Sequence, residues 1–268
     1  MPVIKFTLLI VLWFTVFYPI LPQLVGAWLN HSNESHGMLV PVICLYLAWQ
    51  KKDRLAEEKA QPSITGLWVL LASMVLYLAA FAGGVAVVSR LMIVTSLIGI
   101  VLFVYGRRIF KILAFPLLFA FFMVPVPESI IGMISLPLQL FATNISAFLI
   151  HAVNIPVYQE GNMLYFAQTQ LEVAEACSGI RSVTALTMLS VLFVYLLEFT
   201  LWKKVVILLS AVPIALIANI VRVTGTGILA HFFGAQVARG FLHDFSGLAV
   251  FIFGLVVLFI EAKILKKL

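Results

Sequence analysis

Three residue types that can catalyse acyl transfer occur at the edges of apolar segments in the second half of the chain. Cys177 lies where a polar stretch meets a long apolar run, within residues 175–182. Arg222 and His243 lie at the edges of two later apolar runs. A thiolate is a nucleophile, an imidazole carries protons near neutral pH, and a guanidinium can stabilise an oxyanion. If the three meet on one side of a membrane, they predict thiol attack on a carbonyl carbon.

The residues around Cys177 favour a reactive thiol. Ser178 and Gly179 follow it and are typical of the start of a helix. A thiol at a helix N-terminus near cations has a lowered pKa, so more of it is the nucleophilic thiolate. The alternative is an inert, buried cysteine. The polar neighbours Glu175 and Arg181 argue against that alternative, because an inert core cysteine rarely has such surroundings.

Arg222 and His243 each have an alternative, structural interpretation. Arg222 follows Asn219 by three residues, so the two side chains share a helix face. An arginine at the membrane edge is costly and suggests a function, although it can also be an anchor that extends to the interface. His243 precedes Asp244, which can orient the imidazole or cap the next helix. Taken alone, a loop histidine is more often structural than catalytic.

Composition predicts an all-α polytopic membrane protein. Hydrophobic residues make up 63% of the 268 residues and charged residues only 10%, against about 25% charged in soluble proteins. We expect a single membrane domain over residues 1–268. Two cysteines cannot form a disulfide framework, and Cys44 lies in an apolar run where we expect it to pack. The histidines show no metal-ligand spacing, so we expect neither a metal nor another cofactor.

Apolar runs near 20 residues in length predict about eight membrane spans. The predicted spans are 5–24, 37–50, 66–83, 86–105, 112–126, 183–201, 205–222 and 247–262. A ninth stretch, 129–153, contains Pro137, Gln139, Asn144 and His151. We expect it to lie in the membrane interface or to be re-entrant, because an interfacial helix tolerates a polar face.

The positions of the basic residues predict the orientation. Lysines and arginines near helix ends mark the cytoplasmic side, and the eight-span scheme places both termini there. It leaves four of the 17 basic residues outside, namely Arg90, Arg181, Arg222 and Arg239. The net charge of +6 therefore reflects membrane orientation, and we expect lipids and no nucleic acid as partners. Cys177, Arg222 and His243 all fall on the outer side.

The largest outer segment, residues 154–180, predicts a small cap. Residues 157–166 form two short extended runs around a Glu-Gly-Asn turn, and residues 168–174 alternate polar with apolar side chains. We expect a small hairpin cap at the extracytoplasmic membrane surface.

Two other function classes remain as alternatives. A small transporter or lipid-handling membrane protein would use polar residues to line a pathway near mid-membrane, where this chain has few. An intramembrane protease would need a nucleophile and a base within the bilayer, and the sequence contains no such pair. The clustering of Cys177, Arg222 and His243 at one face favours acyl transfer instead.

Together these residues resemble the exosortase/archaeosortase family of membrane transpeptidases. The similarity covers most of the chain in order and in hydropathy. The matching pieces are Ala176-Cys177-Ser178-Gly179, Arg181-Ser182, Asn219-Ile220-Val221-Arg222, His243 with Ser246-Gly247, and Ser35-His36-Gly37-Met38-Leu39-Val40-Pro41.

The resemblance implies a multipass cysteine protease or transpeptidase of the inner (plasma) membrane, with its site on the extracytoplasmic face. Cys177 would be the nucleophile, Arg222 the transition-state stabiliser and His243 the general acid/base. The substrates would be exported proteins with a C-terminal sorting signal, made of a short motif (Pro-Glu-Pro in the usual bacterial case), a transmembrane helix and a basic tail. Members often accompany exopolysaccharide production. We expect substrate contacts from four residues, which are His36, Glu175, Arg181 and Asn219.

Overall fold

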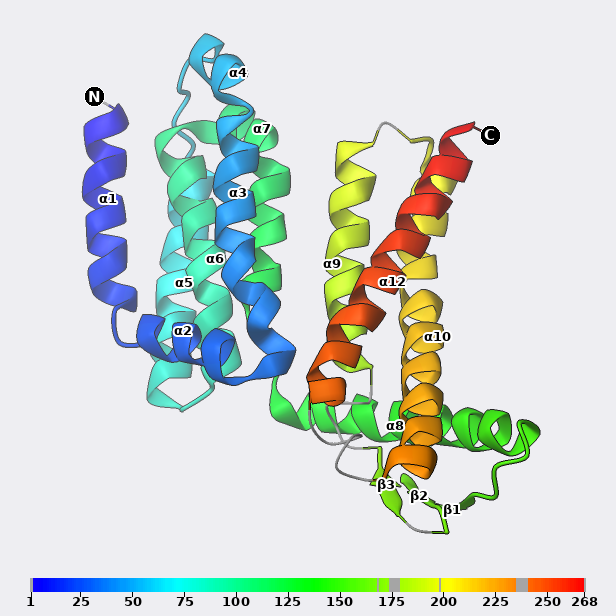
Figure 1. The fold of residues 1–268 in the computed structure, drawn as a ribbon. Helices are drawn as coiled ribbons and strands as arrows, with labels where there is room; N and C mark the ends of the chain where they lie inside the picture. The colour runs from blue at the N-terminus through cyan, green and yellow to red at the C-terminus, as the bar shows by residue number, and fades with distance from the viewer. Residues whose placement is uncertain (1, 168, 174–178, 198, 235–240, 268) are drawn as a thin grey trace. The chain divides into compact units, whose positions relative to one another are not determined.

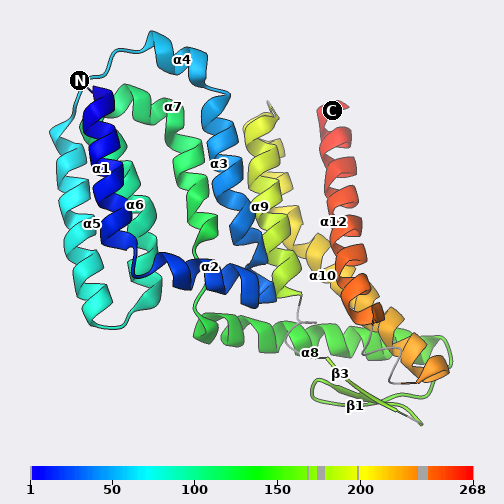
Figure 2. The same cartoon turned by 60° about the vertical axis from the view of Figure 1, so that its left-hand side comes forward.

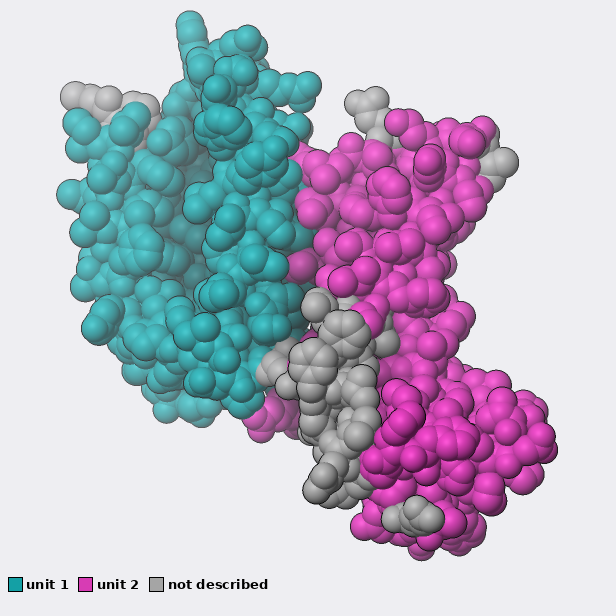
Figure 3. Space-filling model, in the orientation of Figure 1, with its two compact units in different colours: residues 1–127 teal, residues 128–268 magenta. Residues whose placement is uncertain are grey.

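The computed structural model describes residues 2–167, 169–173, 179–197, 199–234 and 241–267, and most of them are helical (Figure 1). The predicted all-α membrane class is confirmed. By contact, the chain divides into two compact units, residues 1–127 and 128–268, which Figure 3 colours separately. The single domain expected over residues 1–268 stays a prediction.

Unit 1 is built from helices alone. They are α1 (Pro2–Phe17), α2 (Leu21–Asn30), the 3-10 helix η1 (Ser32–Met38), α3 (Leu39–Trp49), α4 (Lys52–Glu57), α5 (Ile64–Ala82), α6 (Ala86–Val104), α7 (Gly106–Phe119) and the 3-10 helix η2 (Ala120–Met123). Helices α5 and α6 form an antiparallel hairpin whose backbones approach closely at glycines. A Cβ atom at Gly99 would lie 2.7 Å from the Leu70 nitrogen, so only a small residue permits this packing.

The basic clusters of unit 1 gather at one end, which we call the basic end; it holds Lys51, Lys52, Arg54, Arg107, Arg108 and Lys111. The backbone N–H of Gln61 donates to the Tyr105 carbonyl at 3.0 Å, and Arg108 pairs with Glu58 at 3.9 Å. These contacts join the loop after α4 to the turn between α6 and α7. Helices α5 and α6 run in opposite directions between the two basic clusters, so both clusters come to the same end of the unit. That this end faces the cytoplasm stays a prediction.

The first predicted span, 5–24, is wrong as a single straight helix. Helix α1 ends at Phe17, α2 begins at Leu21, and the two axes bend by 68°. Pro19 lies in the break and Pro22 in the first turn of α2. Proline disfavours helical conformation in the residue before it but is well accommodated in a first helical turn, so the chain stops one helix and starts another.

Unit 2 combines helices with a small sheet. Its elements are α8 (Glu128–Ala152), β1 (Tyr158–Glu160), β2 (Met163–Tyr165), β3 (Gln170–Glu172), α9 (Ile180–Leu196), α10 (Leu201–Phe233) and α12 (Phe241–Lys267). Helices α9, α10 and α12 pack alongside one another, whereas α8 runs across them in both views (Figures 1 and 2).

The count of eight spans is not confirmed. Among the described residues, α5, α6, α8 and α10 are long and apolar enough to cross a membrane, and the bent pair of α1 and α2 would make a fifth. Three other predicted spans correspond to shorter helices: α3 has 11 residues, α7 has 14 and α9 has 17. Helix α8 passes by composition, yet it runs across its neighbours, so the interfacial or re-entrant location of residues 129–153 stays a prediction.

Helix α10 is longer than the span 205–222 predicted. It continues to Phe233, so Arg222 lies inside a helix and not at its end. The extension is stabilised by packing: Val223 belongs to one core cluster with Ile150 of α8 and with Leu164 and Phe166 of the sheet region. Burial of this apolar face offsets the helix-weakening glycines and threonines after Arg222.

The strands predicted within residues 157–174 are present. Strands β1 and β2 form an antiparallel hairpin around Gly161, whose φ is +58°, and β3 adds a third antiparallel strand beside β2. The inner residue Leu164 is fully buried. The sheet thus packs on α8 and α10, while its extracytoplasmic location stays a prediction.

Candidate active site

Two predicted site residues, Cys177 and Glu175, lie outside the described residues. The described part of this motif begins at Gly179, immediately before α9.

Gly179 brings the start of α9 against the middle of α10. Its φ is +81°, the left-handed region that favours glycine. A Cβ atom there would lie 3.1 Å from Cγ, 3.2 Å from Cβ and 3.3 Å from Nδ2 of Asn219, closer than ordinary contact. Asn219 is only 1% exposed. The backbone two residues after Cys177 therefore rests directly on the Asn219 side chain.

Arg222 lies one helical turn after Asn219 on the same side of α10, and it is half-buried. The helix is fastened at this level by α8, because the Ser146 hydroxyl donates to the Ile220 carbonyl at 3.3 Å. Arg222 is thus presented from a rigid helix interior, which is the kind of support that a positioned guanidinium needs.

The packing of α10 against α12 sets the level of His243. Ile207 shares a core cluster with Leu258, and about two turns further along, Ala215 shares a cluster with Phe251. Continuing this antiparallel register for two more turns brings helix position 243 level with Arg222. The side chain of His243 lies outside the described residues.

The remaining predicted residues differ in their surroundings. Arg181 is exposed in the first turn of α9. His36 belongs to unit 1, in η1, whereas all the others belong to unit 2. His36 is half-buried, and its Nδ1 is a buried atom with no hydrogen-bond partner among the described residues. Burial lowers the pKa of His36, so the neutral imidazole is favoured.

The segment around His36 is anchored by an indole. The Trp28 ring fills the space where a Cβ of Gly37 would be, and its Nε1 donates to the Met123 carbonyl at 2.9 Å. The Val126 N–H donates to the Glu34 carboxylate at 3.3 Å. Part of the motif 35–41 therefore serves packing of η1 against α2 and the segment after α7.

Sequence reasoning named Gln139 but missed the buried polar row on α8 to which it belongs. Ser135, Gln139, Thr143 and Ser146 are all buried, at most 7% exposed. Their spacing of four, four and three residues places them on one helix face, and this spacing was the available signal. Asn144 and His151, which suggested the polar face of residues 129–153, are exposed instead.

No metal site is evident in the described ranges. Within them, no three His, Cys, Asp or Glu side chains gather closely enough to hold an ion. Cys44 is half-buried in α3.

Comparison with known proteins identifies one family. The sequence model described as transmembrane exosortase matches residues 28–260, which include every predicted site residue from His36 to His243. No curated protein and no solved structure matches the chain.

Proposed function

Because the chain belongs to the transmembrane exosortase family, we propose that it is a membrane cysteine peptidase and transpeptidase that cleaves the C-terminal sorting signal of exported proteins. The family is one of membrane transpeptidases that act on secreted substrates carrying such signals. The match over residues 28–260 favours this function over a transporter or a lipid-handling protein.

The observation that carries the proposal is the contact between Gly179 and Asn219. It joins the motif that contains Cys177 to the helix that presents Arg222, two segments that the sequence separates by about 40 residues. A nucleophile and an oxyanion stabiliser must both lie close to one carbonyl group. Contact between Gly179 and Asn219 supports the proposal, because it keeps the chain next to Cys177 close to the helix that carries Arg222.

In the proposed first step, the Cys177 thiolate attacks the scissile peptide carbonyl. The carbonyl π electrons move to oxygen, and Arg222 donates hydrogen bonds to the resulting oxyanion. One good oxyanion donor is worth about 3–4 kcal/mol of barrier. Collapse of the tetrahedral intermediate breaks the C–N bond, His243 gives a proton to the leaving amine, and an acyl thioester on Cys177 remains.

In the second step, an amine acceptor, or water, attacks the thioester. His243 accepts the proton of that nucleophile, the C–S bond breaks, and the Cys177 thiolate is regenerated. The register between α10 and α12, which brings position 243 level with Arg222, supports a shared site for these two residues.

Substrate contacts are assigned to four residues. Asn219 can donate to the substrate main chain from beside Gly179, and Arg181 can bind an acidic motif residue from the first turn of α9. Glu175 and His36 complete the proposed set. The substrate is anchored by its own transmembrane helix, so it can diffuse in the plasma membrane and present its outer end to an extracytoplasmic site. A short Pro-Glu-Pro-type motif is the proposed recognition element.

The test is co-expression of the full chain with a tail-anchored substrate that carries such a signal. We expect wild type to shorten the substrate, Cys177→Ala to leave it intact, and the matched control Cys44→Ala to behave as wild type. A membrane-impermeant maleimide should label Cys177 from outside and spare Cys44. Cleavage that survives in Cys177→Ala would refute the thiol mechanism.

A further inference from the structure

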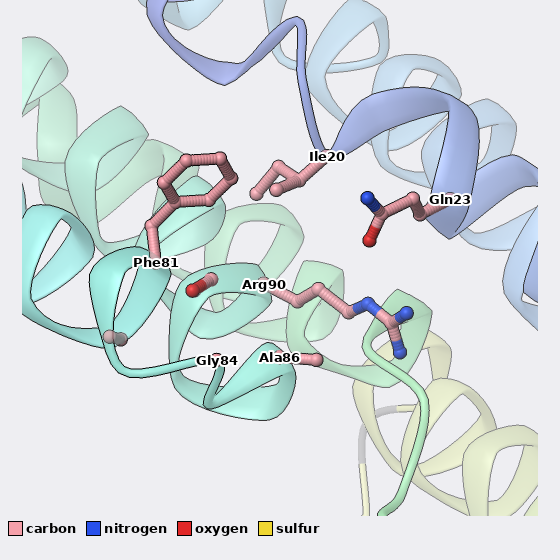
Figure 4. Close-up of a pocket in the computed structure, with 8 residues that line it drawn as sticks. Ile20, Gln23, Phe81, Gly84, Ala86 and Arg90 are labelled. Carbon is pink, nitrogen blue, oxygen red and sulfur yellow. The ribbon is translucent and has the colours of Figure 1, made fainter.

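Unit 1 contains a small amphipathic pocket that the proposed reaction does not use. The cavity has a volume of about 180 Å³ and is lined by Ile20, Gln23, Ala80, Phe81, Gly84, Ala86, Ser89 and Arg90. It lies between the break that separates α1 from α2 and the turn that joins α5 to α6. Phe81 is on one side, and the Arg90 guanidinium and the Gln23 amide are together on the other (Figure 4).

Arg90 is the exception in the charge distribution of unit 1. The other lysines and arginines of residues 2–127 lie toward the basic end, whereas Arg90 belongs to the opposite end with the α5–α6 turn. A cation in such a location costs free energy, and this cost suggests that it has a function. Arg90 forms no ion pair with any carboxylate that the structure describes.

Among the described residues, Glu34 is the one acid that interacts electrostatically with Arg90, and it does so without forming an ion pair with it. Glu34 is 9% exposed and accepts the Val126 N–H. Ser89 is also occupied, since its hydroxyl donates to the Val85 carbonyl at 3.3 Å. The groups left to meet a ligand are therefore the guanidinium and the exposed Gln23 amide, beside the apolar walls of Ile20 and Phe81.

The pocket lies where lipid headgroups are expected. Tyr18 precedes it along the chain and is exposed, and tyrosine concentrates at membrane–water interfaces. Many apolar side chains of α1 are exposed, as on a lipid-facing helix. The lining thus combines hydrogen-bond donors for an anion with an apolar surface for an attached chain.

We propose that this pocket binds the phosphate of a phospholipid headgroup. The Arg90 guanidinium donates a charge-assisted pair of hydrogen bonds to the phosphate oxygens, Gln23 donates from its amide, and the first acyl-chain carbons lie on Ile20 and Phe81. The cavity of about 180 Å³ is smaller than the about 300–1,000 Å³ of sites that enclose a whole small molecule, so we assign it the phosphate group and not an entire ligand.

The experiment measures lipid binding to the full-length chain purified in detergent, by native mass spectrometry. Titrants are phosphatidylglycerol, a diacylglycerol with the same acyl chains, and inorganic phosphate. We expect one tightly bound phosphatidylglycerol and at least tenfold weaker binding of diacylglycerol and of inorganic phosphate. Arg90→Gln should weaken phosphatidylglycerol binding by roughly ten- to hundredfold, since it removes a hydrogen-bonded charge.

Arg54→Gln is the matched control, because Arg54 is an exposed cation at the basic end, and it should bind lipid as wild type does. If Arg90→Gln does not purify as a monodisperse protein, Gln23→Leu and Arg90→Lys test the proposal instead. Each should weaken phosphatidylglycerol binding several-fold. Arg90→Lys should do so because lysine lacks the planar, forked donor group of arginine. Unchanged binding in these variants overturns the proposal. So does inorganic phosphate binding as tightly as the lipid, or an acidic peptide that displaces the lipid in an Arg90-dependent manner.

Discussion

Two glycines, one in each unit, allow close approach for different purposes. At Gly37 the neighbour is the Trp28 indole, which is held by its hydrogen bond to the Met123 carbonyl. At Gly179 the neighbour is the buried Asn219 side chain, and the glycine also has a φ of +81°. The first contact holds η1 against α2 within unit 1. The second sets a polar side chain against the start of a helix that follows the proposed nucleophile. Both lie in pieces of the sequence on which the resemblance to the family rests, so such a resemblance alone does not separate packing from chemistry.

Among the substitutions that probe these two glycine contacts, the largest effect is expected from Gly179→Ala. The substitution costs about 1–2 kcal/mol for the left-handed backbone, and its Cβ also pushes against Asn219. We expect cleavage of a tail-anchored substrate to fall by roughly a hundredfold per folded molecule, since small displacements of catalytic groups have effects of that size. The measurement pairs a cleavage assay with a detergent-stable melting curve. Full activity in Gly179→Ala would show that this contact does not position the site.

A double-mutant cycle sharpens the same comparison. Asn219→Ala removes two of the three close atoms, Cγ and Nδ2, but keeps the Cβ at 3.2 Å. The double variant should therefore regain part of the lost stability, up to about 1 kcal/mol relative to additive behaviour. It should not regain activity, because the proposed Asn219 contact with the substrate is lost. Melting temperatures and cleavage rates of the four variants provide the test; strict additivity of their stabilities would argue against direct contact.

Gly37→Ala should show the opposite profile. The new Cβ displaces the Trp28 ring and breaks its hydrogen bond, so we expect a loss of about 1–3 kcal/mol in stability. Cleavage by the folded fraction should stay within a few-fold of wild type. Trp28→Phe, which removes only the donor, should cost about 0.5–1.5 kcal/mol. A hundredfold loss of cleavage in a well-folded Gly37→Ala would instead assign this motif to catalysis.

Sequence patterns predicted those features that depend on local composition. Hydropathy identified helices near all the predicted spans, and the Glu-Gly-Asn turn located the β1–β2 hairpin. Sequence patterns failed where long-range packing determines the length of an element. Hydropathy predicted that a helix ends at Arg222, but packing of Val223 in its core cluster stabilises α10 as far as Phe233. The two prolines that break the first span were visible in the sequence, yet continuous apolar character outweighed them.

Within the site, the sequence indicated residue types but not their neighbours. The shared face of Asn219 and Arg222 follows from three-residue spacing. That Gly179 would rest on Asn219 depends on how α9 packs against α10, which no local pattern encodes. The roles of Cys177, Arg222 and His243 stay predictions.

The smallest expected effect is a pH dependence of stability centred on η1, opposite in sign for the half-buried His36 and the buried Glu34. Burial lowers the pKa of His36 from its usual 6.5, so only the unfolded chain gains a proton just below that pH. His36 therefore contributes stability that is present above about pH 6.5 and lost as the pH falls through the lowered folded pKa. Burial raises the pKa of Glu34 above 4.5, so Glu34 lowers stability as the pH rises through its pKa in the folded protein.

Melting curves from pH 4 to 8 test both signs. His36→Gln should reduce the loss of stability toward acid pH, whereas Glu34→Gln should reduce the loss of stability above pH 4.5. Identical slopes in both variants and wild type would show that neither His36 nor Glu34 governs the pH dependence of the stability of unit 1.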